Sequence, residues 1–218
     1  INPKIEKNIR KIKISKEIKN IVSLKVKNQY ENSPYPRWEK IALKNKPGKV
    51  GNFFKNLNLR LDEKIINNWD SVDVLVAGCG TGQHAITTAT KYQKANVTAL
   101  DLSAHSLSYA KRKADELEIK NINFIQMDLL NLKSFNKKFN IIEAVGVLHH
   151  MNKPYEGWKV LYENLVIGGL MMIGLYSDIA RKHVVKIRND IKKLKIKIDK
   201  ENNINFREKI ILSNNSDY

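Results

Sequence analysis

The chain has 218 residues and a mass of 25.1 kDa, and 42% of its residues are hydrophobic, which is enough for one sizeable core with an appendage. Its single cysteine, Cys79, excludes an internal disulfide and a zinc site built from several cysteines. The sequence opens without an apolar signal segment, and its longest apolar stretch, Leu165 to Tyr176, is interrupted by glycines and too short to span a bilayer. We therefore expect a cytoplasmic protein without a membrane partner.

The formal net charge of +17, from 39 Lys and Arg against 22 Asp and Glu, has two interpretations. It can mark a nucleic-acid partner. It can also follow from an AT-rich genome, in which Lys, Asn and Ile are abundant together. The lysines are scattered and few aromatic residues lie among them, which favours the second interpretation.

Residues 1–62 are expected to form a basic N-terminal arm. Over residues 1–30, six apolar positions recur at near-helical spacing: Ile5, Ile9, Ile12, Ile18, Ile21 and Val22. The segment Y-E-N-S-P-Y-P-R-W follows at 30–38, and its two prolines predict an extended or turn geometry.

From residue 72 onward, short apolar runs alternate with amphipathic segments. Strands are predicted over 72–76, 97–100, 122–126, 139–145 and 170–175. A first helix is predicted over 84–92. A second begins at a Ser103 cap and has Leu107, Ala110, Ala114 and Leu117 on one face. A third begins at Pro154, has Trp158, Leu161 and Leu165 facing inward, and ends at Gly168–Gly169. This alternation predicts an α/β core over 63–177, Rossmann-like and doubly wound, with a mainly parallel sheet covered by helices on both faces.

The loops after the first three predicted strands carry the residues that point to a ligand. The first loop, G-C-G-T-G, places glycines at 78, 80 and 82, and the second strand ends on Asp101. Asp128 follows the third strand. In such sheets the ligand lies beyond the carboxyl ends of the strands, where bare amides approach it and an acid accepts hydrogen bonds from ribose hydroxyls. The order predicts a cofactor that contains adenosine.

These residues also carry a resemblance to a known family. From Val72 to Tyr176 the chain resembles class I S-adenosylmethionine-dependent methyltransferases. The resemblance lies in V-L-V-A-G-C-G-T-G, in Asp101, in M-D-L after the third strand and in G-V-L-H-H after the fourth. Val76 departs from the acidic residue that most of that family has there. The chain also resembles a narrower group, a bacterial methyltransferase module often found after tetratricopeptide repeats, although no such repeats precede the domain here. The segments that carry this resemblance are L-V-A-G-C-G-T-G-Q-H-A, D-L-S-A-H-S-L-S-Y-A-K-R-K-A-D-E-L, G-V-L-H-H-M and P-Y-P-R-W.

The resemblance implies methyl transfer from S-adenosylmethionine, with no metal, to an acceptor that it does not identify. We expect a small molecule, with a nucleic-acid-binding or RNA-modifying protein as the alternative. The residues assigned to the cofactor are Gly78, Cys79, Gly80, Thr81, Gly82, Gln83, Asp101, Leu102, Met127, Asp128, Leu129 and Gly146.

The acceptor side is expected around His149 and His150, after the fourth strand. Either histidine is a candidate general base, since imidazole titrates near neutral pH, and each has a purely structural alternative. Tyr35, Arg37 and Trp38 either close over the site, with Arg37 near an anionic group, or only fasten the N-terminal arm to the domain. Tyr176, after the fifth strand, completes the predicted acceptor pocket.

The last zone, residues 178–218, is expected to hold a C-terminal amphipathic helix. Ala180, Val184, Ile187, Ile191, Leu194 and Ile198 step by four and three along it. Only I-N-F-R-E-K-I-I-L remains beyond it, so that the terminal strand pair of such domains is hard to place. The chain is then either truncated or has its sheet edge covered by another chain.

Overall fold

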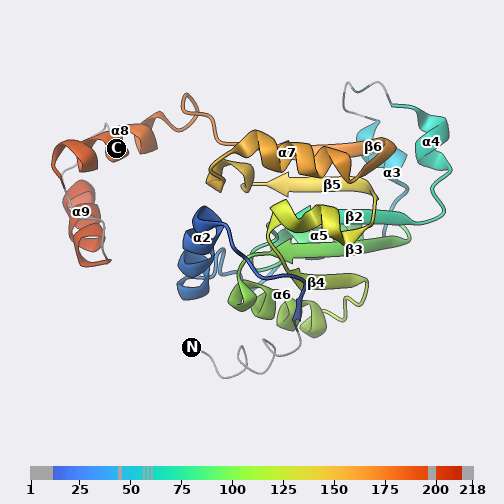
Figure 1. The fold of residues 1–218 in the computed structure, drawn as a ribbon, viewed down its shortest axis with the longest axis horizontal. Coiled ribbons are helices and arrows are strands. Elements are labelled where there is room, and N and C mark those ends of the chain that lie inside the picture. Colours follow the sequence, from blue (N-terminus) through green and yellow to red (C-terminus); the bar gives the residue numbers. More distant parts are fainter. Residues whose placement is uncertain are drawn as a thin grey trace. The chain divides into compact units, whose positions relative to one another are not determined.

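The computed structural model describes residues 12–43, 46–55, 57, 59, 61–195 and 200–212. The chain divides into two compact units, Ile1–Leu175 and Tyr176–Tyr218. The first unit holds the sheet and its covering helices (Figure 1), and the second holds α8 (Lys182–Lys193) and α9 (Lys200–Leu212). The predicted boundaries at residues 62 and 177 stay predictions.

The described part of the first unit contains one sheet in which all paired strands run parallel. Its strands are β1 (Lys13–Ile14), β2 (Val72–Ala77), β3 (Ala95–Asp101), β4 (Ile122–Gln126), β5 (Phe139–Val145) and β6 (Leu165–Gly174), in the order β1-β4-β3-β2-β5-β6. From β2 the chain first builds outward through β3 and β4, and then returns to build β5 and β6 on the other side. This is the predicted doubly wound, Rossmann-like arrangement, and its switch point lies between β2 and β5.

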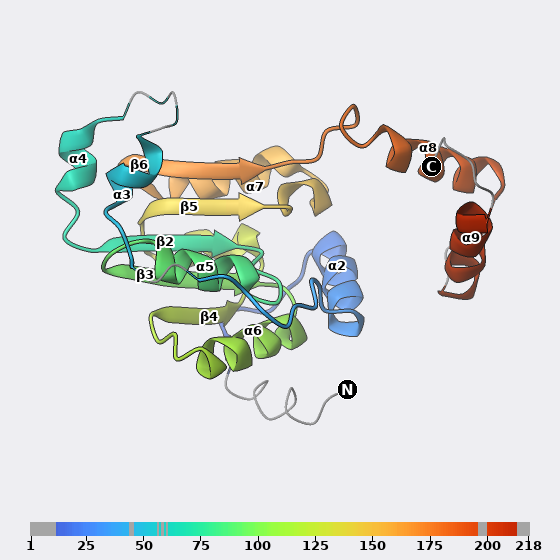
Figure 2. The ribbon, with the colours of Figure 1, turned by 180° about the vertical axis from the view of Figure 1, so that it is seen from behind.

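Helices cover both faces of the sheet because alternate residues of each central strand are apolar on opposite sides. On one face α5 (Gln83–Lys91) and α6 (Ala104–Glu116) pack on Val74 and Val76; α5 lies in front of the sheet in Figure 2. On the other face α7 (Pro154–Glu163) and the short helix η1 (Leu129–Phe135) pack on Leu75 and Ala77, as Figure 1 shows for α7. Ser103 caps α6 as predicted, since its side chain accepts a hydrogen bond from the Ser106 amide.

In the described part of residues 1–30, where apolar positions have near-helical spacing, the N-terminal arm contains a strand as well as a helix. Ile5 and Ile9 lie outside the described residues. Ile12 is buried, and Lys13–Ile14 forms β1, which pairs with Ile125 and Gln126 at the free edge of β4. A strand edge offers a complete row of backbone partners, and this outweighs local helical spacing. The helix α2 (Ile21–Asn32) begins only after Asn20, whose side chain accepts hydrogen bonds from the Val22 and Ser23 amides.

Two short helices, α3 (Val50–Phe54) and α4 (Glu63–Asn67), connect the arm to β2. In both views α2 lies beyond the carboxyl ends of the strands (Figures 1 and 2). The N-terminal arm therefore reaches the carboxyl ends of the strands, where ligands bind in this fold class.

The predicted end of α7 at Gly168–Gly169 is wrong. The helix ends at Glu163, because the backbone N–H of Asn164 bonds back to Leu161 and Tyr162 and its side-chain amide donates to the Val160 carbonyl at 2.7 Å. β6 begins directly at Leu165, which is half-buried against the core.

Gly168 instead marks an irregularity at the start of β6. It has a φ of +74°, and the register with β5 shifts there. Leu161 is buried as predicted, whereas 40% of Trp158 is exposed and the prediction that it faces inward is wrong. In the second unit α8 covers the centre of the predicted C-terminal helix, and Ile198 lies outside the described residues.

Candidate functional site

The glycine loop joins β2 to α5 and has left-handed backbone at all three glycines, with φ of +66° at Gly78, +52° at Gly80 and +86° at Gly82. L side chains rarely adopt this conformation. The Cys79 amide donates to the Leu100 carbonyl, and the Gly80 amide donates to the Asp101 carboxylate at 2.8 Å. The loop after β2 is thus fastened to the end of the neighbouring strand β3.

Each loop glycine also faces another part of the protein. A Cβ built on Gly78 would lie 2.3 Å from a Val147 methyl group, and one on Gly82 would lie 2.5 Å from the Ala110 Cβ. At Gly80 the nearest atom is the Tyr35 carbonyl oxygen, at 2.8 Å. The sequence predicted that the cofactor lies beside Gly80. In the structure the Tyr35 carbonyl group of the N-terminal arm lies there instead.

Asp101 lies at the centre of these contacts. Its carboxylate accepts hydrogen bonds from Gly80 N and, at 2.9 Å, from Ser103 N. Burial raises the pKa of Asp101 above its ordinary value, and the nearby charge of Glu31 adds to this, while the backbone hydrogen bonds oppose it. Burial and the charge of Asp101 also raise the pKa of the Cys79 thiol well above its ordinary value, which keeps that thiol protonated.

The other predicted cofactor residues line the ends of neighbouring strands. Thr81 is buried within the loop, Gln83 starts α5, and the Leu102 carbonyl accepts a hydrogen bond from the Gln126 side chain at 2.8 Å. Gly146, after β5, has a φ of +74° and donates its amide to the Gly174 carbonyl.

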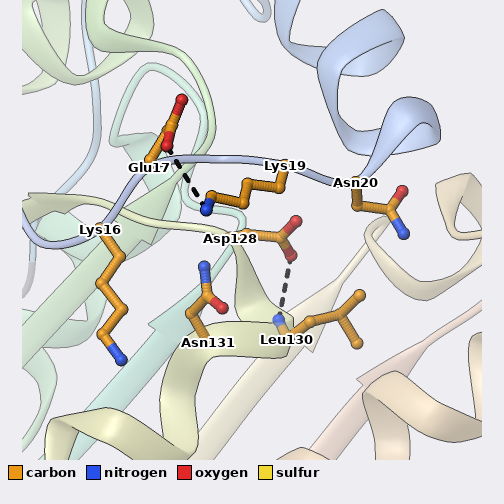
Figure 3. Close-up of a pocket in the computed structure, with 7 residues that line it drawn as sticks. All are labelled: Lys16, Glu17, Lys19, Asn20, Asp128, Leu130 and Asn131. Atoms are coloured by element: carbon orange, nitrogen blue, oxygen red, sulfur yellow. Dashed lines mark hydrogen bonds and ion pairs between the residues drawn. The ribbon is translucent and has the colours of Figure 1, made fainter.

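A pocket of about 420 Å³ lies beyond the end of β4 (Figure 3). The buried Asp128 lines it and accepts a hydrogen bond from the Leu130 amide at 3.0 Å, between the buried side chains of Met127 and Leu129. The rest of the lining comes from η1 and from the arm: Lys16, Glu17, Lys19, Asn20, Leu130 and Asn131. The arm thus forms one wall of a polar pocket that contains a predicted cofactor residue.

The two histidines lie in the short helix η2 (Leu148–His150), directly after β5. Their rings are 4.2 Å apart between centroids. The His150 Nε2 lies 3.3 Å from the Tyr30 hydroxyl of α2, and burial lowers the pKa of His150 below its ordinary value. Burial therefore favours the neutral imidazole of His150.

The segment 35–38 lies against the glycine loop. Trp38 is buried and its indole N–H donates to the Thr81 carbonyl at 3.1 Å, while the Thr81 hydroxyl donates to the Pro36 carbonyl. Tyr35 and Arg37 are exposed. Trp38 therefore has the contacts of a fastening residue, and only the two exposed side chains remain available to a ligand.

Tyr176 belongs to the second unit. The guanidinium of Arg181 lies 3.9 Å from the centre of its ring. Its part in the acceptor pocket stays a prediction.

Sequence reasoning missed two further groups of residues. Tyr30 and Glu31, in the last turn of α2, reach the loops after β5 and β3, and no pattern in the sequence signals this. Glu143 is buried in β5, with its carboxylate 2.9 Å from His84 Nε2 and 2.6 Å from the Thr88 hydroxyl that donates to it. An acid within the apolar run F-N-I-I-E-A-V was a visible signal for this second group.

Within the described ranges, no three or more His, Cys, Asp or Glu side chains gather as they would around a metal ion. The helices there include none with the length and apolar character that a membrane span needs.

Residues 74–169 match a family described as "Methyltransferase domain". An uncharacterized protein of Synechococcus sp. is 33% identical over 54% of this chain and 28% of its own length. The (S)-coclaurine N-methyltransferase of Papaver somniferum is 28% identical over 48% of this chain and 29% of its own length. The malonyl-[acyl-carrier protein] O-methyltransferase of Priestia megaterium is 27% identical over 49% of this chain and 38% of its own length. The matches therefore span well under half of each of these relatives.

A solved S-adenosylmethionine-dependent methyltransferase from Clostridium acetobutylicum is similar over 56% of this chain and 54% of its own, with 24% identity and a TM-score of 0.44. The fold assignment rests instead on the strand order and the parallel pairing described above. Residues 74–169 therefore match the methyltransferase family, and they lie within a Rossmann-like α/β fold.

Proposed function

We propose that this chain binds S-adenosylmethionine and transfers its methyl group to a small-molecule acceptor. The observation that carries the proposal is the position of Asp101, whose carboxylate lies at the carboxyl end of β3, beside β2, and accepts a hydrogen bond from the glycine loop. The family match over residues 74–169 supports the same activity.

The residues at this point fit such a cofactor. A carboxylate can accept about four hydrogen bonds, so the backbone amides that bind Asp101 leave capacity for ribose hydroxyls. The pocket beside Asp128 lies at the next strand end, where the side chain of Asn131 and the backbone of η1 offer polar partners for an adenine ring. In this proposal the loop 78–82, Asp101 and the residues 127–129 hold the cofactor.

When bound, the cofactor supplies a methyl group on a positively charged sulfur, which makes that methyl group electrophilic. The chain's part is to hold the acceptor in line with it, to exclude water and, where the acceptor must lose a proton, to accept that proton. His150 is the best candidate for the last task, because burial favours its neutral imidazole. His149 lies against it, and the exposed Arg37 is available to an anionic group of the acceptor.

A small-molecule acceptor agrees with one of the similar proteins, which is named for methyl transfer to (S)-coclaurine. That name belongs to a relative of which this chain spans 29%.

Calorimetry tests the proposal directly. The 218-residue chain should bind S-adenosylmethionine and its demethylated product, and a screen of small amines, alcohols and carboxylates with labelled donor should then identify an acceptor. Failure to bind either form of the cofactor would refute the proposal, and binding without transfer to any acceptor would indicate a binding module instead.

A further inference from the structure

The last turn of α2 joins two loops that lie on opposite sides of the glycine loop. Tyr30 contacts the loop after β5, and Glu31 contacts the loop after β3. Because β2 lies between β3 and β5 in the sheet, this pair of adjacent residues spans the proposed cofactor site. Figures 1 and 2 show α2 beyond the carboxyl ends of these strands.

Glu31 binds the first turn of α6. Its carboxylate accepts hydrogen bonds from the Ala104 and His105 amides at 2.9 and 3.0 Å and lies 3.3 Å from the Ser103 hydroxyl that donates to it. It also contacts the His105 ring through Nδ1. A carboxylate at a helix N-terminus is stabilised both by these donors and by the helix dipole.

This turn of α6 also positions Asp101, since the Ser103 amide donates to the Asp101 carboxylate at 2.9 Å. Glu31 therefore holds, from a distant part of the sequence, the loop that carries the proposed ribose-binding acid. The Tyr30 hydroxyl, 3.3 Å from His150 Nε2 with the two rings edge to face, does the same for the acceptor side.

α2 itself is fixed to the domain mainly at its two ends. Before it, β1 pairs with β4, and after it Trp38 is buried against the glycine loop. None of the residues of α2 is buried. Val22, Val26 and Tyr30 are half-buried on one face of α2. An element without a fully buried residue can release while it exposes little of the core, so its opening free energy is low compared with that of the sheet.

We propose that Tyr30 and Glu31 are positioning residues that hold the loops after β3 and β5 across the cofactor site, so that the cofactor enters and leaves when the last turn of α2 releases. This rests on the proposed function. A clamp of this kind limits association as well as dissociation, whereas a residue that only stabilises the bound state affects dissociation alone.

Stopped-flow binding of S-adenosylmethionine, followed by tryptophan fluorescence, separates these cases. Glu31→Ala removes the hydrogen bonds to α6 and should raise the association and dissociation rate constants each by about 10-fold, with a smaller change in Kd. Tyr30→Phe should raise both rate constants by a smaller factor. The matched control is Gln29→Ala, an exposed position on the same helix, which should leave both unchanged.

Hydrogen exchange of the chain without cofactor supplies the second readout. The Ala104 and His105 amides should exchange faster in Glu31→Ala, and at the wild-type rate in Gln29→Ala. Cofactor binding with an association rate constant that Glu31→Ala leaves unchanged would overturn the positioning role alone. No cofactor binding by the wild-type chain would overturn the proposed function, and with it this role.

Discussion

Replacing Asp101 with Asn tests the residue on which the proposed site depends most. The carboxylate binds Gly80 N at 2.8 Å and Ser103 N at 2.9 Å, and a hydrogen bond to a charged group contributes about 1.5–3 kcal/mol. Asn keeps one acceptor oxygen and turns an N–H group toward the other backbone donor. Relief of the buried charge offsets part of this loss, so we expect a decrease of about 1–2 kcal/mol in the free energy of unfolding.

Asp101→Asn should also weaken the binding of the cofactor. Loss of the charged acceptor for ribose hydroxyls should weaken binding by about 10- to 100-fold, which calorimetry measures. The control is Asp115→Asn on the exposed face of α6, which is outside the proposed cofactor residues and loses only the Lys111 ion pair, worth about 0.3–0.5 kcal/mol. Equal affinity of the Asp101→Asn and wild-type chains would refute the assignment.

The same residue predicts a pH dependence of binding. The pKa of Asp101 is raised above 3.8, so the carboxylate becomes protonated at a higher pH than an exposed Asp would. Affinity for the cofactor should therefore fall as the pH is lowered through this raised pKa, and Asp101→Asn should lose that dependence. An unchanged pH profile in the variant would show that another group controls binding.

Three further substitutions test the surroundings of the site. Gly82→Ala should lower the free energy of unfolding by about 2 kcal/mol or more, because of its positive φ and the clash at its Cβ, whereas Gly51→Ala, with no atom closer than 3.4 Å, should be neutral or stabilising in denaturant titrations. Trp38→Ala should cost about 3–5 kcal/mol of stability, while a residue that only covered the ligand would lose turnover with its stability kept. Burial raises the pKa of Glu143, but the hydrogen bonds from His84 and Thr88 outweigh burial, so that the pKa is lowered overall. The ionised carboxylate therefore stabilises the fold above the ordinary pKa of Glu, and this stabilisation is lost as the pH falls through the lowered pKa. Glu143→Gln should be less stable than the wild type at neutral pH, and the difference should disappear in acid.

The sequence predicted the central strands and the order of the loops because these depend on local apolar patterns. The strands 122–126 and 139–145 have the predicted bounds, and the Ser103 cap of α6 is where it was expected. The two strands carry buried apolar residues, and α6 begins at a serine that caps it. In these elements the tertiary contacts therefore agree with the local sequence preference.

The N-terminal arm could not be predicted in the same way. Lys13–Ile14 becomes a strand only because β4 presents a free edge, and Glu31 reaches α6 only because α2 crosses the strand ends. Any carboxylate brought to that place would satisfy the amides of Ala104 and His105, so the sequence around Glu31 needs no recognisable motif. Contacts of this kind depend on the positions of distant elements, which local patterns do not contain.

The glycine loop shows that a glycine-rich segment can have a physical cause other than the predicted ligand. The sequence predicted a loop cleared of side chains for a ligand, yet the missing Cβ atoms of Gly78, Gly80 and Gly82 face Val147, the Tyr35 carbonyl and Ala110. The glycines therefore first allow β5, the arm and α6 to close around the loop in a left-handed conformation. That closure brings the Gly80 amide to Asp101, so the loop contributes to the proposed site through the backbone geometry that its glycines permit.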